Sequence, residues 1–173
     1  MEQQTTAKVD RQATGLLDIS FWSNIVVMVL IIGITAVNFF RAQTAQGALL
    51  SNASPELVLI VSAALVLYLG YGCFTVMTTK LRLNQAYISI DQAGVSGCSL
   101  EKPMMREPGE PFTAAFGEIR SVSIVGVPIT KKHVAASLKI ETADRSYVVP
   151  APEGLHDLVN TLSERMTGGA AED

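Results

Sequence analysis

The sequence predicts a membrane protein of mixed class: a hairpin of two transmembrane helices, followed by an α+β soluble domain with a curved antiparallel sheet capped by a C-terminal helix. Two observations predict this arrangement. Residues 21–40 and 57–79 contain no Asp, Glu, Lys, Arg or His, although charged residues make up 17% of the chain. From residue 84 onward apolar and polar residues alternate in short runs, which is typical of strands.

Each uncharged run is long enough to cross a bilayer. A helix rises about 1.5 Å per residue, so about twenty residues span a hydrocarbon core of about 30 Å. A buried helix of a soluble protein usually has a polar face at this length, and neither run has one. We therefore expect transmembrane helices at residues 19–41 and 57–79, joined by a short non-cytoplasmic loop at residues 42–56.

The first run is longer than the apolar region of a signal peptide, which has about 7–15 residues. It also follows a polar segment, residues 1–18, for which we expect a mobile tail without regular structure. Small residues after the run, at positions 42–45, leave signal cleavage as the alternative. Aromatic rings favour the headgroup level of a membrane. The residues that we expect to anchor the first helix at the membrane interfaces are Phe21, Trp22, Phe39, Phe40 and Arg41.

The basic residues beside the two runs predict the orientation. Four of them lie outside the hairpin, namely Lys8, Arg11, Lys80 and Arg82, whereas the connecting loop is flanked by Arg41 alone. Cytoplasmic flanks carry the excess of Lys and Arg. We therefore expect a multi-pass protein of the cell membrane with both termini in the cytoplasm.

Residues 80–167 are expected to form the cytoplasmic domain. About six strands are predicted, at residues 86–90, 95–100, 112–116, 120–127, 136–141 and 146–149. A helical stripe of apolar residues follows, made of Leu155, Leu158, Val159, Leu162 and Met166. Gly168 and Gly169 end this helix, and residues 168–173 are expected to be disordered.

The order of these elements resembles a family of small bacterial membrane proteins with a pleckstrin-homology-like (PH-like) domain. The matching segments are residues 87–91 with 94–95 as a first hairpin, 116–122 as an aromatic corner before a central strand, and 138–142 with 147–150 as a closing hairpin. The resemblance implies a PH-like curved sheet in the inner membrane of a bacterium, a non-catalytic role, and contacts with lipids, peptides or proteins. The phosphoinositide-binding branch has several bases around its first hairpin, whereas the turn here, residues 91–94, has none.

Catalytic, cofactor and metal sites are not expected. His133, His156 and the two cysteines lack the spacing of metal ligands, and no hydrolase, phosphate-binding or zinc-protease motif occurs. The net charge of −3 argues against nucleic-acid binding.

Two surfaces are candidates for binding. Met104, Met105 and Arg106 lie in a proline-rich loop, and methionines suit adaptable contacts with a protein partner or a second copy of the chain. The candidate lipid-facing residues are Lys80, Arg82, Lys131 and Lys132, because bases near a membrane attract anionic headgroups. We therefore expect a membrane-anchored interaction module. The alternatives are a sensor of anionic lipid and a small accessory subunit of a membrane transport complex.

Overall fold

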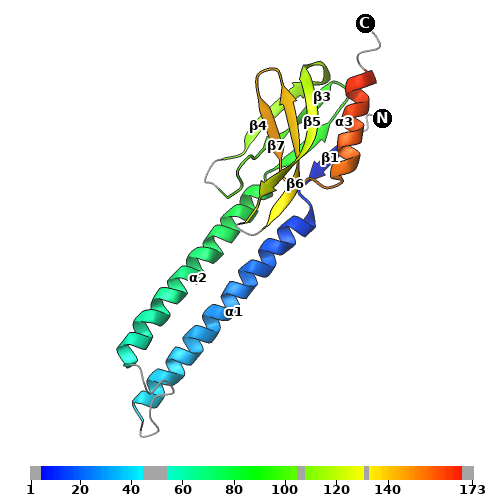
Figure 1. Ribbon diagram of the computed structural model, residues 1–173. Coiled ribbons are helices and arrows are strands. Elements are labelled where there is room, and N and C mark those ends of the chain that lie inside the picture. The colour runs from blue at the N-terminus through cyan, green and yellow to red at the C-terminus, as the bar shows by residue number, and fades with distance from the viewer. Residues whose placement is uncertain (1–4, 45–53, 105–107, 131–132, 169–173) are drawn as a thin grey trace. The chain divides into compact units, whose positions relative to one another are not determined.

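The computed structural model describes residues 5–44, 54–104, 108–130 and 133–168 (Figure 1). The chain divides into two compact units. Residues Asp18–Met77 form a helical unit, and Met1–Leu17 together with Thr78–Asp173 form a β-rich unit.

The helical unit contains most of α1 (Arg11–Ala42) and α2 (Pro55–Leu83). Both helices are long and apolar enough to cross a membrane, by length and composition. Both helices begin before the expected spans because N-terminal capping groups lie outside the apolar runs. Asp10 Oδ1 accepts a hydrogen bond from Gln12 N at 2.9 Å, and Ser54 Oγ accepts one from Leu57 N at 3.3 Å.

Small and polar side chains bring α1 and α2 together as antiparallel neighbours. Thr35 Oγ1 donates a hydrogen bond of 2.7 Å to Ser62 Oγ. Nearer the other end of the pair, a Cβ built on Gly72 would lie 3.1 Å from Asn24 Nδ2. Interhelical hydrogen bonds and small residues at close approaches are typical of helices that pair within a membrane.

The β-rich unit has seven strands in two antiparallel sheets within the described residues. The first sheet contains β1 (Thr5–Lys8), β2 (Tyr87–Ile90), β3 (Gly94–Ser99) and β4 (Glu110–Ala115), in that order. The second sheet contains β5 (Ile119–Pro128), β6 (Val134–Thr142) and β7 (Ser146–Val149), after the short helix η1 (Phe116–Glu118). The helix α3 (Leu155–Gly168) follows. The predicted α+β class is confirmed, but one sheet of about six strands is replaced by two sheets.

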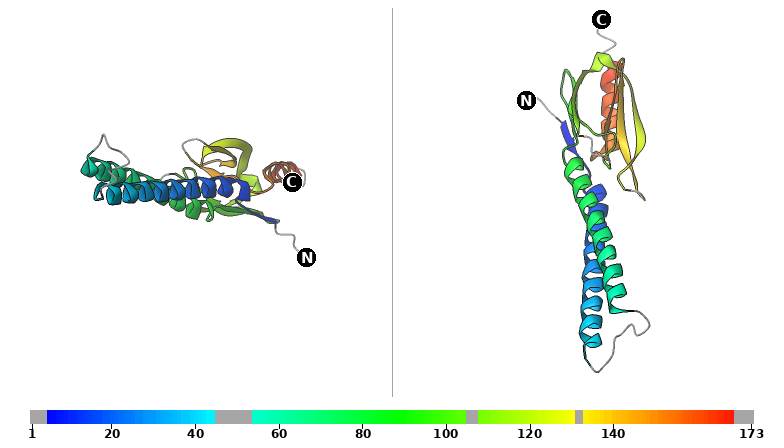
Figure 2. Two further views of the ribbon diagram at one scale, coloured as in Figure 1. Left: turned by 90° about the horizontal axis from the view of Figure 1, so that it is seen from below. Right: turned by 90° about the vertical axis from the view of Figure 1, so that its left-hand side faces the viewer.

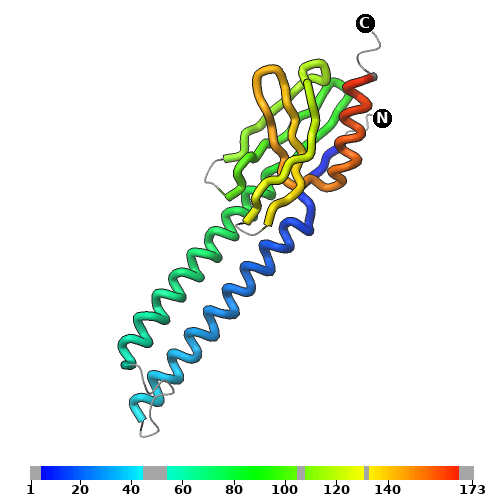
Figure 3. The backbone as a smooth tube through the Cα atoms, viewed as in Figure 1, coloured from blue at the N-terminus to red at the C-terminus, as the bar shows by residue number. Residues whose placement is uncertain are grey.

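The expectation of a mobile tail at residues 1–18 is wrong for residues 5–17. Thr5–Lys8 form the edge strand of the first sheet, paired with β2 from Thr5 opposite Ile90 to Lys8 opposite Tyr87. Figure 3 follows the chain from β1 into α1 and, after α2, back into β2 beside it. The sequence did not reveal this strand because Ala7 alone points into the core, at 8% exposure, and gives no alternating pattern.

The two sheets meet face to face and share one core. Leu100 N donates to Val148 O at 2.7 Å, Val148 N donates to Ser99 Oγ at 2.9 Å, and the rings of Phe112 and Tyr147 stack at 4.6 Å. The second view in Figure 2 shows the sheets as two layers with α3 at their open end. These contacts join β3 and β4 to β7.

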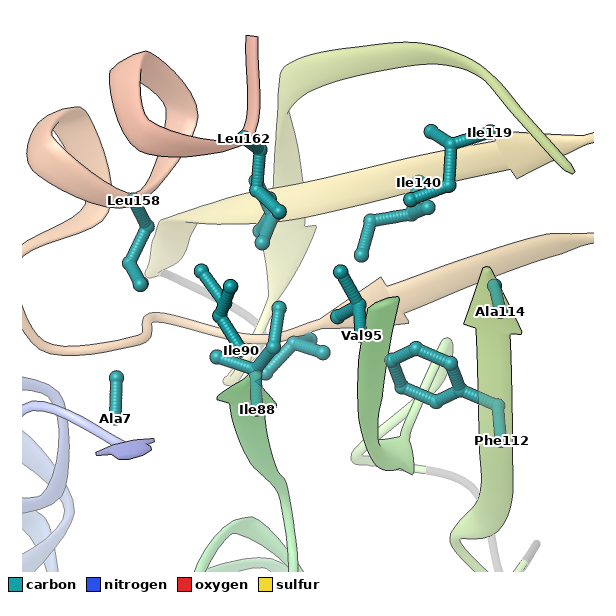
Figure 4. Close-up of a cluster of buried hydrophobic side chains, with 12 residues drawn as sticks. Ala7, Ile88, Ile90, Val95, Phe112, Ala114, Ile119, Ile140, Leu158 and Leu162 are labelled. Atoms are coloured by element: carbon teal, nitrogen blue, oxygen red, sulfur yellow. The ribbon is translucent and has the colours of Figure 1, made fainter. Parts of the chain in front are cut away.

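The predicted apolar stripe of α3 fills the core. Leu158 and Leu162 are 4% and 0% exposed, and Figure 4 shows both pointing from α3 toward Ile88 and Ile90 of β2. The guanidinium of Arg165 lies 5.8 Å from the ring centroid of Phe116 and donates a hydrogen bond to the carbonyl of Asp91, at the β2–β3 turn. The helix is therefore held against both sheets.

Candidate functional site

Of the residues predicted to contact a protein or a lipid, the structure describes Met104, Lys80 and Arg82. Met104 is half-buried in a turn after the buried Pro103, and Lys80 and Arg82 lie in the last turns of α2. Four candidates lie outside the described residues: Met105, Arg106, Lys131 and Lys132. The predicted roles of all seven stay predictions.

The predicted interface anchors lie near the two ends of the apolar part of α1. Trp22 and Phe40 are 63% and 68% exposed, and each ring forms an edge-to-face pair with its neighbour, Phe21 or Phe39. Arg41 is half-exposed, although its Nε is buried without a hydrogen-bond partner in the described part of the chain. Their role at the membrane interface stays a prediction.

The β5–β6 hairpin has an apolar face that the rest of the domain leaves partly uncovered. Directly paired residues of antiparallel strands point to the same face of a sheet. On β6, Leu138 and Ile140 are fully buried, so their partners on β5 mark the core side of the hairpin. From Ile124 toward the β5–β6 turn, the residues of this face are exposed on β5, and so are their neighbours Ala136 and Val134 on β6. We call these residues the open face: Ile124, Gly126, Pro128, Val134 and Ala136.

The two large side chains of the open face are strongly exposed. Ile124 is 42% exposed and Val134 is 68% exposed. A Cβ built on Gly126 would lie 2.8 Å from Val134 Cγ1, so the Val134 side chain lies over the backbone of β5. The open face is therefore a continuous apolar strip across both strands.

The opposite face of the same hairpin is buried near the β5–β6 turn, which holds the strands in place there. Val127 is 5% exposed and Ile129 is 2% exposed. Ser137 is fully buried, and its Oγ accepts a hydrogen bond of 3.3 Å from Ala151 N. The exposure of the open face is thus not the result of a frayed hairpin end.

The strand β5 also has a free edge. It is the first strand of its sheet, paired with β6 on one side only. Within the described residues, no backbone hydrogen bond joins residues 120–128 to any segment other than β6. A strand edge of this kind presents a row of N–H and C=O groups to another chain. The free edge and the open face lie on the same strand.

A shallow, open depression of about 350 Å³ lies at the other end of the second sheet. Its lining is polar and consists of Arg120, Lys139, Glu141, Thr142, Ala143, Asp144, Arg145 and Ser146. Lys139 Nζ lies 2.5 Å from Glu141 Oε1, and Arg145 Nη1 lies 2.9 Å from Glu110 Oε1. Because acidic neighbours pair with two of its three bases, the depression has little charge left to attract an anion.

The ionisable groups with shifted pKa values show no catalytic arrangement. Hydrogen bonds from Lys139 and from Ser121 Oγ, the latter at 2.7 Å, lower the pKa of the exposed Glu141 carboxyl. Burial raises the pKa of the Cys98 thiol, which favours the unreactive protonated form. His133 and His156 are exposed, and the described ranges contain no group of three residues that could hold a metal ion.

No family model matches the chain, and no curated protein and no solved structure is similar to it. The fold and the surface thus define a class only: an α+β domain joined to two helices that are long and apolar enough to cross a membrane. The sequence had indicated that Val122 and Ile124 share a face. It has no signal that Val122 packs against the core while Ile124 stays exposed.

Proposed function

We propose that this protein is a non-catalytic, membrane-anchored interaction module that docks an extended segment of a protein partner along β5. The observation that carries the proposal is the open face beside the free edge of β5. An added strand takes its affinity from backbone hydrogen bonds and its specificity from alternate side chains. Here alternate side chains of such a segment would lie beside Ile124, which is 42% exposed and belongs to the same apolar strip as Val134.

The proposal includes the membrane anchor. We infer that α1 and α2 cross the cell membrane and place both termini in the cytoplasm, as the flanking bases predict. The antiparallel sheets and the closing helix support a PH-like fold of the kind found in bacterial inner-membrane proteins. A second copy of the chain is the alternative occupant of β5, because an edge strand can also pair with its own kind.

The test introduces the same charge on the two faces of the hairpin. Val134→Asp places a carboxylate in the open face, whereas Ser123→Asp places one at an exposed position on the opposite face of β5. A photoreactive side chain at Ala136 then crosslinks the full-length protein in its native membrane. We expect Val134→Asp to lower the yield of the partner crosslink by about tenfold or more, because a docked segment would bury the charge.

The Ser123→Asp variant serves as the matched control and should retain the crosslink. Equal yields in both variants, or equal losses, would contradict docking at the open face. A crosslink product that contains only this chain would assign the surface to self-assembly.

A further inference from the structure

The N-terminal segment occupies a groove formed by two distant parts of the chain. On one side β1 pairs with β2 over four residues. On the other side lie residues 151–153. Asp10 N donates to Ala151 O and Glu153 N donates to Lys8 O, both at 2.8 Å, and Val9 bridges Pro152. The end of the segment is therefore hydrogen-bonded along both of its edges, as a bound peptide is in a strand-addition complex.

The floor of this groove is the hydrophobic core. Ala7 is 8% exposed and belongs to the same buried cluster as Ile88, Ile90 and Leu162. Figure 4 shows Ala7 on β1 facing this cluster. Without the segment, the edge of β2 and part of the core would lie open to water.

One wall of the groove is held in a conformation that side chains rarely adopt. Ala151 has a φ of 41°, in the left-handed region that favours glycine. Its carbonyl accepts the Asp10 amide, and its own amide donates to the buried Ser137. A strained backbone conformation persists where surrounding contacts hold it in place. The hydrogen bond from Asp10 of the N-terminal segment is one of the contacts that hold Ala151.

We propose that the edge of β2 and residues 151–153 form a strand-acceptor site whose ligand is the chain's own segment 5–10, and that this site stays empty when only one of the two long helices has crossed the membrane. The chain between the two parts of the domain runs through α1 and α2. Because β1 and β2 belong to one sheet, they lie on the same side of the membrane. The chain between them must therefore cross the membrane an even number of times. A chain with only one helix inserted has its N-terminal segment on the wrong side, and the site stays empty.

The site therefore couples completion of the domain to insertion of the hairpin. An empty site marks a hairpin with one helix inserted, and it exposes an edge of β2 with two large apolar residues, Ile88 and Ile90. This inference rests on the proposed crossing of the membrane by α1 and α2, and it does not depend on the proposed docking at β5, which lies in the other sheet.

The first experiment traps the segment in its site in native membranes. Thr6 Oγ1 and Ser89 Oγ lie 3.2 Å apart on paired residues of β1 and β2. In a background of Cys73→Ala and Cys98→Ser, Thr6→Cys with Ser89→Cys should form a disulfide on mild oxidation with copper phenanthroline. The matched control is Thr6→Cys with Ser96→Cys, because Ser96 lies one strand further away. We expect the yield of the first pair to exceed that of the control by about tenfold or more. Equal yields would overturn the proposal.

The second experiment measures what the segment protects. Ala7→Asp puts a carboxylate into the core, whereas Ser123→Asp puts the same charge at an exposed position in the other sheet. In full-length protein in nanodiscs, Ala7→Asp should lower the hydrogen-exchange protection of amides 87–90 by about tenfold or more, and Ser123→Asp should leave it unchanged. Full protection of β2 in the Ala7→Asp protein would show that the segment is not needed to close the groove.

Discussion

At the scale of single residues, the polar depression shows how neighbours set the charge of one carboxyl group. Glu141 accepts hydrogen bonds from Lys139 and from Ser121, and both favour its ionised form. The folded-state pKa is therefore below the ordinary value of 4.5. The interaction stabilises the fold above that pH and is lost as the pH falls through the lowered pKa. Because Glu141 is exposed, we expect this contribution to be small.

The prediction is a titration midpoint for the Glu141 carboxyl below 4.5, followed by NMR of the side-chain carbon. Lys139→Gln should raise the midpoint most, because Lys139 is the largest cause of the shift, and Ser121→Ala should raise it less. Ser123→Ala is the control and should not change it. A midpoint at or above 4.5 in the unmodified protein would contradict the predicted interaction.

At the scale of elements, the contact between α1 and α2 rests on few polar groups. The Thr35 hydroxyl lies 2.7 Å from Ser62 Oγ across the pair and 2.8 Å from Ile31 O within α1, whereas the hydroxyl of Thr75 donates to Tyr71 O within α2. Interhelical hydrogen bonds in membranes contribute about 0.6 kcal/mol on average, because the separated helices also find partners. The two threonines thus offer a matched comparison of bonds between helices and within one helix.

We predict a coupling free energy of about 0.6 kcal/mol between Thr35→Val and Ser62→Ala in a double-mutant cycle. The free energy of unfolding is measured in bicelles. The same cycle with Thr75→Val in place of Thr35→Val should give no coupling. Coupling of equal size in the two cycles would show that the Thr35–Ser62 hydrogen bond does not join the helices.

The elements also differ in how well the sequence predicted them. The α3 helix was predictable because five apolar residues at helical spacing define its buried stripe. The β1 strand was not, because four residues with one small buried side chain carry no periodic signal. Its strand conformation depends on backbone pairing with β2 and with residues 151–153, which lie far away in the sequence.

At the scale of the whole molecule, the net charge of −3 bears on the choice between protein docking and lipid sensing. A lipid sensor relies on bases near anionic headgroups, and its binding weakens in salt. Docking at the open face relies on apolar contact and backbone hydrogen bonds instead. The two functions therefore predict different responses of the β5–β6 hairpin to the lipid around it.

We predict that hydrogen exchange of amides 134–136 is the same in zwitterionic and in anionic nanodiscs. The measurement uses full-length protein at low and at physiological salt. Protection that appears only with anionic lipid and disappears in salt would favour the lipid-sensing alternative. Lys131→Gln with Lys132→Gln would then test whether the predicted basic pair is responsible.

The sequence by itself determined the two long helices, most strands and the stripe of α3. Each of these depends on composition or periodicity within one segment, and a local pattern is sufficient to encode it. Only the tertiary structure decided that residues 5–8 complete the first sheet and that Ile124 and Val134 stay exposed. Both outcomes depend on which distant segment covers a given face or edge, and no pattern within a single strand records its neighbours.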